Sequence, residues 1–247
     1  MAETVGDPHG LGHRFSSQRL VGARARRLRG LHGRMVIERC ERDARLRGMS
    51  TTAAPTLRPP RALAVFWIVA AAAGWVVSFL LYQEYIGQLT GSDPLFSCQI
   101  SVLVTCGPNL LSPGGNLLGF SNSIIGMTLF LGPVYAGVSA LAAPEGLRVW
   151  FWRVFTVFVL GGFALVHFFA YRSVFEYGSL CPWCMVVWLV TIPLFWFTLG
   201  WALRDGVWGR MPRLGAALLT WAPLLTVLND ALIAIVAQVR LDVLGSL

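Results

Sequence analysis

The chain has 247 residues, of which 55% are hydrophobic and only 13% are charged, and its mean hydropathy is +0.63. A soluble domain carries about 25% charged residues, so this composition argues against a soluble protein and indicates a membrane protein. The net charge of +8 is unevenly distributed, because 13 of the 20 basic residues, all of them arginines, precede Ala62. The charge therefore belongs to a tail rather than to a folded basic face, and we expect no nucleic-acid partner.

The first 61 residues differ in composition from the rest of the chain. Residues 1–61 are rich in Arg, Gly and Ser and show little apolar periodicity, which is typical of a disordered segment. We assign them to a cytoplasmic tail and residues 62–247 to one transmembrane domain. A basic amphipathic helix over residues 19–47, lying on anionic membrane lipid, is an alternative for part of the tail. Met49 is an alternative start of translation.

Five mainly apolar segments follow the tail, each as long as the roughly 20 residues that a membrane-spanning helix needs. Backbone polar groups cannot stay unpaired in lipid, so such segments must be helices or barrel strands, and their length favours helices. The expected spans are residues 62–82, 123–143, 149–171, 181–203 and 214–239. The sequence therefore predicts an all-α integral membrane protein with five transmembrane helices.

The arginines predict the orientation of these spans in the plasma (inner) membrane. With the N-terminus in the cytoplasm, the inner side receives the tail arginines and five more, whereas the outer side receives only Arg172 and Arg240. The 40-residue connection 83–122 carries no basic residue and falls outside. We therefore expect a cytoplasmic N-terminus and an extracytoplasmic C-terminus.

The long outer connection is expected to contain a short interfacial helix. Asp93-Pro94 resembles an N-cap followed by proline at the first helical position. The apolar run that follows ends at Gly107-Pro108. A short helix at the membrane surface fits this pattern better than a free loop.

Four of the five cysteines share the outer side in this topology. Cys98 and Cys106 lie in the outer connection, and a Cys-Pro-Trp-Cys motif, with Cys181 and Cys184, opens the fourth span. Disulfides persist on that side of a membrane. Cys40 lies in the tail, where we expect an inert thiol.

A CxxC motif at the start of a helix is suited to redox chemistry. Cys181 would lie among unpaired backbone N–H groups at the positive end of the helix dipole, which we expect to lower its pKa. Cys184 follows one turn deeper and points towards the bilayer, from which a lipid-soluble oxidant would approach. Two cysteine pairs lie on one face of the membrane, and one of them is at the start of a helix. This arrangement indicates a thiol–disulfide relay.

The cysteines could instead bind a metal or form purely structural disulfides. A zinc site would need Cys98 and Cys106 as further ligands, and their wide spacing does not suit an all-cysteine site, so no metal is expected. A purely structural disulfide between Cys98 and Cys106 is a stronger alternative. A non-enzymatic transporter or scaffold whose cysteines are structural is the corresponding alternative for the whole protein.

Polar and aromatic residues within the spans also admit alternatives. His167 is expected to be a packing residue rather than a proton relay. Asp230 and Asn229 interrupt the fifth span, and an intramembrane acid is a functional candidate. Many of the ten tryptophans fall near the ends of spans and are expected to be interfacial anchors.

The cysteine pattern resembles that of the vitamin K epoxide reductase family, in particular of its bacterial members. The residues that carry the resemblance are the outer-loop pair Cys98 and Cys106, the run Ser-Asn-Ser-Ile-Ile-Gly at 121–126, and the CxxC motif at 181–184. The resemblance covers about residues 66–196. It implies a four-helix bundle around a quinone pocket, capped by the cysteine-bearing loop, together with the fifth helix that bacterial members often have.

The resemblance also implies roles for the cysteines. Cys181 and Cys184 would be the active-site pair, with Cys184 nearer the quinone. Cys98 and Cys106 would be the shuttle pair, in which Cys98 is attacked by the partner's thiolate. Cys106 would exchange with Cys181 through a transient mixed disulfide.

The quinone-binding residues implied by the resemblance are Asn122, Ser121 and Trp188. Asn122 would donate a hydrogen bond to a quinone oxygen and stabilise the charge that develops on reduction. Ser121 and Ser123 could instead cap the second span, a role that Asn122 could share. Trp188 stands where the animal enzymes have a tyrosine, four residues after the second active-site cysteine, which makes vitamin K epoxide a doubtful substrate.

The resemblance implies two partners in electron transfer. Many bacterial members continue into a thioredoxin-like domain after the fifth helix, and this chain does not, so a separate thioredoxin-fold partner of the DsbA type is expected outside the membrane. The final acceptor would be a membrane quinone, menaquinone or ubiquinone. The expected function is the reoxidation of this partner, which supports disulfide formation in exported proteins. One alternative is a quinone or epoxide reductase with other thiol donors. An oxidase of the DsbB type is a further alternative, but in that family the CxxC pair precedes the spaced pair, and the opposite order in this chain argues against it.

Overall fold

The computed structural model describes residues 56–91, 103–242 and 245, all within the unit Pro55–Leu247. Most of the expected tail, Cys40 and Cys98 lie outside the described residues. Residues 56–61, which we assigned to the tail, are structured. Strand β1 (Thr56–Leu57) pairs antiparallel with β2 (Leu147–Arg148), and the first long helix begins at Arg61. This end of the tail therefore belongs to the membrane domain.

Five helices in the described part of the chain are long and apolar enough to cross a membrane, which confirms the expected all-α membrane fold. They are α2 (Arg61–Thr90), α4 (Asn122–Ala142), α5 (Val149–Arg172), α6 (Pro182–Asp205) and α7 (Pro212–Leu241). A single π-helical turn, η1 (Ser173–Tyr177), continues α5. The apolar side chains exposed on the outside of these helices, such as Val227 and Val239, are the surface that lipid would cover.

Helix α2 is longer than predicted. It continues for eight residues beyond the expected end at position 82 and stops at Gly91, whose left-handed backbone (φ 67°) suits the end of a helix. Glu84 and Gly87 are buried in this extension. The polar residues after Leu81 therefore mark the end of the apolar surface and not the end of the helix.

The short outer helix begins where we expected it to end. Helix α3 (Gly107–Leu111) starts at Gly107-Pro108, with proline in its first turn. Val104, expected to be helical, instead forms a parallel β-bridge with Leu180. The rest of the expected helix, residues 93–102, lies outside the described residues.

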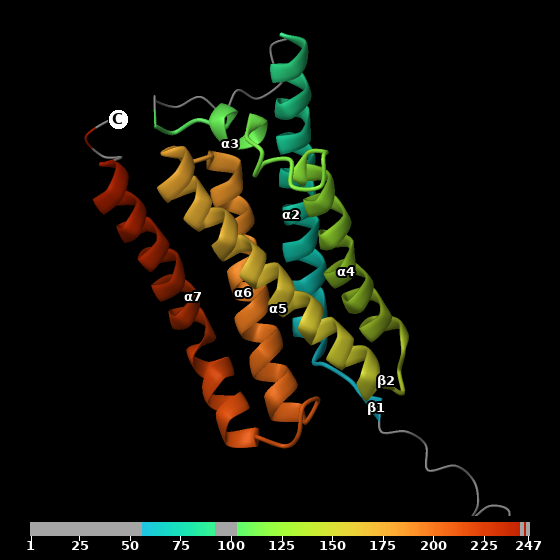
Figure 1. Ribbon diagram of the computed structural model, residues 1–247. Coiled ribbons are helices and arrows are strands. Elements are labelled where there is room, and N and C mark those ends of the chain that lie inside the picture. Colours follow the sequence, from blue (N-terminus) through green and yellow to red (C-terminus); the bar gives the residue numbers. More distant parts are fainter. Residues whose placement is uncertain (1–55, 92–102, 243–244, 246–247) are drawn as a thin grey trace, which may run out of the picture. The chain divides into compact units, whose positions relative to one another are not determined.

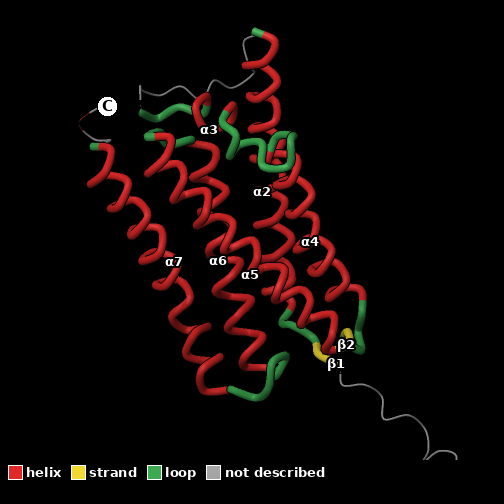
Figure 2. Tube along the Cα trace, in the orientation of Figure 1, coloured by secondary structure: helices red, strands yellow, loops and turns green. Residues whose placement is uncertain are grey.

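The long helices run side by side, with α3 at one end of the bundle and β1 and β2 at the other (Figure 1). Loops join the helices at these two ends (Figure 2). Helix α2 packs against α4 and α6, α5 packs against α6, and α7 packs mainly against α6. Four helices thus form a bundle and α7 is added at its side.

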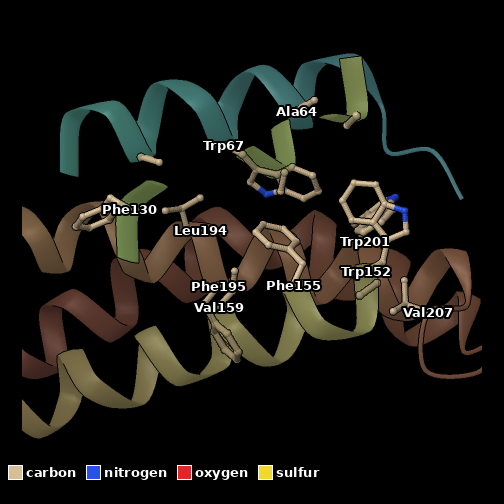
Figure 3. Close-up of a cluster of buried hydrophobic side chains, with 14 residues drawn as sticks. Ala64, Trp67, Phe130, Trp152, Phe155, Val159, Leu194, Phe195, Trp201 and Val207 are labelled. Atoms are coloured by element: carbon tan, nitrogen blue, oxygen red, sulfur yellow. The ribbon is translucent and has the colours of Figure 1, made fainter. Parts of the chain in front are cut away.

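An aromatic cluster fills the bundle towards the β1–β2 end (Figure 3). The side chains of Trp67, Trp152 and Trp201 are fully buried, and the ring centroids of Trp152 and Trp201 lie 5.0 Å apart. The indole N–H of Trp67 donates to Thr198 Oγ1 at 2.9 Å, and the indole of Trp152 donates to Leu57 O at 3.0 Å. The expectation that tryptophans near span ends are interfacial anchors is therefore wrong for these three, because neighbouring helices and β1 surround their rings.

Candidate functional site

Two cysteines from distant parts of the chain meet at the α3 end of the bundle. The Sγ atoms of Cys106 and Cys181 lie 2.9 Å apart, and both side chains are fully buried. A disulfide bond measures about 2.05 Å, so these sulfurs are in contact and not bonded. Cys106 is disulfide-bonded, whereas Cys181 and Cys184 are free thiols. A thiol thus faces a disulfide sulfur, which is the arrangement that thiol–disulfide exchange requires.

The segment that carries Cys106 is held onto the chain just before Cys181. Leu180 N donates to Leu103 O at 2.8 Å, within the β-bridge between Val104 and Leu180. The Asn109 amide donates to Ser179 O at 3.1 Å and to Ser179 Oγ at 2.9 Å. These bonds on either side of Cys106 fix its sulfur against Cys181.

The leucines Leu81 and Leu110 close the cysteine contact off from solvent. Both are buried and form one cluster with Cys106 and Cys181. Leu81 comes from α2 and lies just before residue 82, where this span was expected to end. The contact between Cys106 and Cys181 is therefore buried between α2, α3 and the start of α6.

Cys181 is the N-cap of α6, and Pro182 occupies the first turn as expected. The backbone N–H of Cys184 donates to Cys181 Sγ at 3.4 Å. Burial nevertheless raises the pKa of the Cys181 thiol, and the neighbouring Cys184 raises it further, whereas the backbone N–H groups of Cys184 and Trp183 lower it by less. The expected lowering of this pKa is therefore wrong, because the cost of burying a thiolate exceeds the stabilisation from the helix start.

Cys184 lies one turn deeper and lines a cavity of about 180 Å³. The cavity is bounded by α2, α3, α4, α5, η1 and α6, and none of α7, whose helix is described in full, lines it. Most of its lining is apolar. Several polar side chains, those of Asn109, Asn122, Ser173, Tyr177 and Cys184, come from elements that meet at the α3 end. The cavity therefore suits an apolar ligand with a polar head group near the cysteines.

Asn122 lines this cavity and also organises the loop before α4. Its Nδ2 donates to Gly114 O at 2.5 Å, and its Oδ1 accepts from Leu117 N at 3.1 Å. Its own backbone N–H donates to Gly115 O at 2.8 Å. One of the two Nδ2 protons remains for a ligand, so the loop role and the expected ligand role are compatible.

Ser121 and Trp188 occupy different positions relative to the cavity. Ser121 is buried, its Oγ accepts from Ser123 N at 3.3 Å as the N-cap of α4, and it is not among the lining residues. Trp188 is buried and lines the cavity one turn after Cys184. The structure thus assigns Ser121 a capping role and brings Trp188 and Cys184 together.

His167 and Asn229 form a contact between α5 and α7. The Phe163 carbonyl can only accept, so His167 Nδ1 donates to it at 2.9 Å, and Nε2 accepts from Asn229 Nδ2 at 2.9 Å. Neither residue lines the cavity. Both ring nitrogens are used in packing, as expected of a structural histidine.

Sequence reasoning missed several residues of this site. Asn109, Ser173 and Ser179 hold the cysteine segment, and the Ser173 hydroxyl donates to Ser179 O at 2.5 Å. Tyr177 lines the cavity from η1. Their proximity to Cys181 in the sequence was the one available signal for Ser173, Tyr177 and Ser179.

A family model described as "Vitamin K epoxide reductase family" matches residues 65–199 of the chain. The match covers more than half of the chain and spans the four helices that enclose the cavity, but it does not reach α7. No curated protein and no solved structure matches the chain.

Proposed function

Because the chain belongs to the vitamin K epoxide reductase family, as its cysteine pattern predicted, we propose that this multi-pass membrane oxidoreductase passes electrons from protein thiols to a quinone. The donor would be a thioredoxin-fold protein of the DsbA type outside the membrane. The electrons would travel through Cys98 and Cys106 to Cys181 and Cys184. The observation that carries this proposal is the 2.9 Å contact between Cys106 Sγ and Cys181 Sγ.

The first exchange reduces the loop pair. A thiolate of the partner attacks Cys98 in the Cys98–Cys106 disulfide, and Cys106 leaves as a thiolate. The partner's second thiol then displaces Cys98 and closes the partner's own disulfide. The partner has lost two electrons, and Cys98 and Cys106 have gained them as two thiols.

The second exchange moves these electrons inward. The Cys106 thiolate attacks Cys181 Sγ in the Cys181–Cys184 disulfide, and Cys184 leaves as a thiolate next to the cavity. Cys98 then attacks Cys106, restores the loop disulfide and releases Cys181. A disulfide at Cys106 together with free Cys181 and Cys184, the described state, is what this exchange would leave, which supports the proposed order of steps.

The cavity suits a quinone because its lining is mainly apolar and several of its polar side chains come from the end that holds Cys184. When bound, a menaquinone or ubiquinone would accept two electrons and two protons. Cys184 would face the quinone, and the remaining Nδ2–H of Asn122 would donate a hydrogen bond to it. Trp188 would form part of the cavity wall beside it. The buried Leu81 and Leu110 keep water from the neighbouring cysteines.

The test is quinone reduction by the purified protein in detergent micelles, with dithiothreitol as the thiol donor and ubiquinone-1 as the acceptor. Cys184→Ser and Cys181→Ser should each lower turnover by at least about 10³-fold, because the terminal dithiol is lost. Cys40→Ser is the matched control and should turn over at the rate of the unaltered protein. Normal turnover of Cys184→Ser would refute the proposed route.

The physiological role is tested in a bacterium that lacks its own quinone-linked thiol oxidase. Expression of the chain should restore disulfide formation in exported proteins, and Cys181→Ser should not. If the protein were only a structural scaffold, the unaltered chain and Cys181→Ser would give the same level of disulfide formation in exported proteins.

A further inference from the structure

The π-helical turn η1 places one tyrosine at the polar end of the cavity. Single π-turns are uncommon and are often found at functional sites. This one ends at Gly178 (φ 63°), whose N–H bonds to Ser173 O, and it directly precedes the segment 179–181 that meets Cys106. Tyr177 is its last residue and lines the cavity together with Cys184 and Asn122.

The hydroxyl of Tyr177 is buried and has no hydrogen-bond partner among the described residues. A buried hydroxyl without a partner destabilises the fold, and most such groups in proteins are satisfied. A ligand with an acceptor oxygen would remove this destabilisation. The phenol O–H is therefore a hydrogen-bond donor that the described part of the protein leaves unused.

The surroundings of Tyr177 fix the position of its ring. A side chain on Gly114 would overlap the hydroxyl oxygen, so the loop approaches it closely only because residue 114 is glycine. The Asn122 amide binds the carbonyl of the same Gly114. The Arg172 guanidinium carbon lies 5.4 Å from the centre of the Tyr177 ring, and Arg172 Nη2 forms an ion pair with Glu176 Oε2 at 2.6 Å.

From these contacts we propose that the Tyr177 hydroxyl donates a hydrogen bond to a carbonyl oxygen of the bound quinone. This inference rests on the proposed function and adds a second donor near the same glycine that Asn122 binds. The bond orients the quinone head group towards Cys184, and it strengthens as the carbonyl oxygen gains negative charge on reduction. Tyr177 is thus a quinone-contacting residue that lies outside both the cysteine motif and the Ser-Asn-Ser-Ile-Ile-Gly sequence at 121–126.

Tyr177→Phe removes one oxygen and no described bond within the protein, so it provides a clean test. In the absence of quinone, its melting temperature should equal or exceed that of the unaltered protein, because an unsatisfied hydroxyl is removed. Added ubiquinone-1 should stabilise it less than it stabilises the unaltered protein. The KM for ubiquinone-1 should rise about tenfold, which corresponds to about 1.4 kcal/mol, with a smaller change in kcat.

Tyr171→Phe is the matched control. Tyr171 lies six residues earlier, near the end of α5; it is exposed, stacks on Phe175 and does not line the cavity. Tyr171→Phe should leave both the KM for ubiquinone-1 and the quinone-induced stabilisation unchanged. Gly114→Ala should shift both readouts in the same direction as Tyr177→Phe, because the added methyl group displaces the phenol oxygen.

Each result separates the inference from the proposed function. If the unaltered protein reduces ubiquinone-1 and Tyr177→Phe matches it in KM and in quinone-induced stabilisation, the inference is wrong and the proposed function stands. A lower melting temperature of Tyr177→Phe without quinone would also contradict it, because the hydroxyl would then be structural. If the unaltered protein neither reduces nor is stabilised by ubiquinone-1, both proposals fail.

Discussion

Cys106 and Cys181 are 75 positions apart in the sequence, and their sulfurs lie 2.9 Å apart in a pocket without solvent. Burial raises the pKa of the Cys181 thiol, so only a small fraction of it is thiolate near neutral pH. Exchange at such a site depends on proximity rather than on a large thiolate population, because holding two reacting groups together replaces a bimolecular encounter. The hydrogen bonds of Asn109 to Ser179 provide that proximity.

This contact predicts which disulfide forms when only two cysteines are left. With Cys40 replaced by serine, the variant Cys98→Ser/Cys184→Ser retains Cys106 and Cys181. Diamide should join these two in one chain within seconds to minutes, because their sulfurs already touch. Peptide mass spectrometry after non-reducing digestion measures the product.

The matched control retains Cys106 and Cys184 in the variant Cys98→Ser/Cys181→Ser. Cys184 lies one turn deeper and lines the cavity, whereas the sulfur of Cys106 touches that of Cys181. The disulfide of the control should therefore form at least about tenfold more slowly. Equal rates in the two variants would show that the Cys106 segment samples both positions, and the assignment of Cys181 as the exchanging residue would be lost.

At the scale of elements, α6 and α7 approach each other closely at two glycines. A Cβ on Gly215 would lie 2.5 Å from the Cα of Arg204, and a Cβ on Gly200 would lie 3.0 Å from the backbone N of Leu219. Both contacts involve backbone, which cannot move aside as a flexible side chain can. Small residues that let helix backbones approach are a common means of helix association in membranes.

Gly215→Ala should therefore weaken the attachment of α7. The added methyl group forces the helices apart, and we expect a loss of about 1–3 kcal/mol, measured as a lower melting temperature in micelles. Gly161→Ala is the control, because a Cβ at Gly161 meets nothing within 4 Å and alanine favours the helix. Since α7 does not line the cavity, the KM for quinone should change little in either variant. A large rise in KM for Gly215→Ala would place α7 in the site.

The sequence predicted some elements well because hydropathy reports which surface meets lipid. The second span was expected at 123–143 and is α4, Asn122–Ala142. Prediction failed where structure depends on contacts within the protein. The extension of α2 to Thr90, the β-bridge of Val104 and the π-turn of η1 are set by neighbouring segments, and no local pattern encodes them.

The candidate site shows the same division. Cys106, Cys181 and Cys184 were singled out by residue type and spacing, and Asn122 by the family resemblance. The structure brings Cys106 to Cys181 and places Cys184 and Asn122 on one cavity, while Cys98 lies outside the described residues. The pKa of Cys181 was predicted in the wrong direction, because the depth of its burial is a property of packing. Tyr177 was missed, because a tyrosine near the end of a span is usually an anchor at the membrane surface.

At the scale of the whole molecule, the two ends of the bundle differ in charge. Arg148, Arg153, Arg204 and Arg210 lie at the end that holds β1 and β2, where Arg153 Nε donates to Val207 O at 2.9 Å. Among the described residues, the other end has Arg172 and Arg240. That end also holds Cys106, Cys181 and the polar part of the cavity.

This asymmetry predicts the orientation in the membrane, because arginine-rich ends stay in the cytoplasm. In a chain whose cysteines are all replaced by serine, Leu118→Cys and Glu145→Cys introduce single exposed thiols at opposite ends. A membrane-impermeant maleimide should label Leu118→Cys on intact spheroplasts and Glu145→Cys only after permeabilisation. The opposite pattern would put Cys106 and Cys181 on the cytoplasmic side, where thiols are kept reduced. A route that oxidises exported proteins through these cysteines would then be impossible, whatever the chain does to quinones.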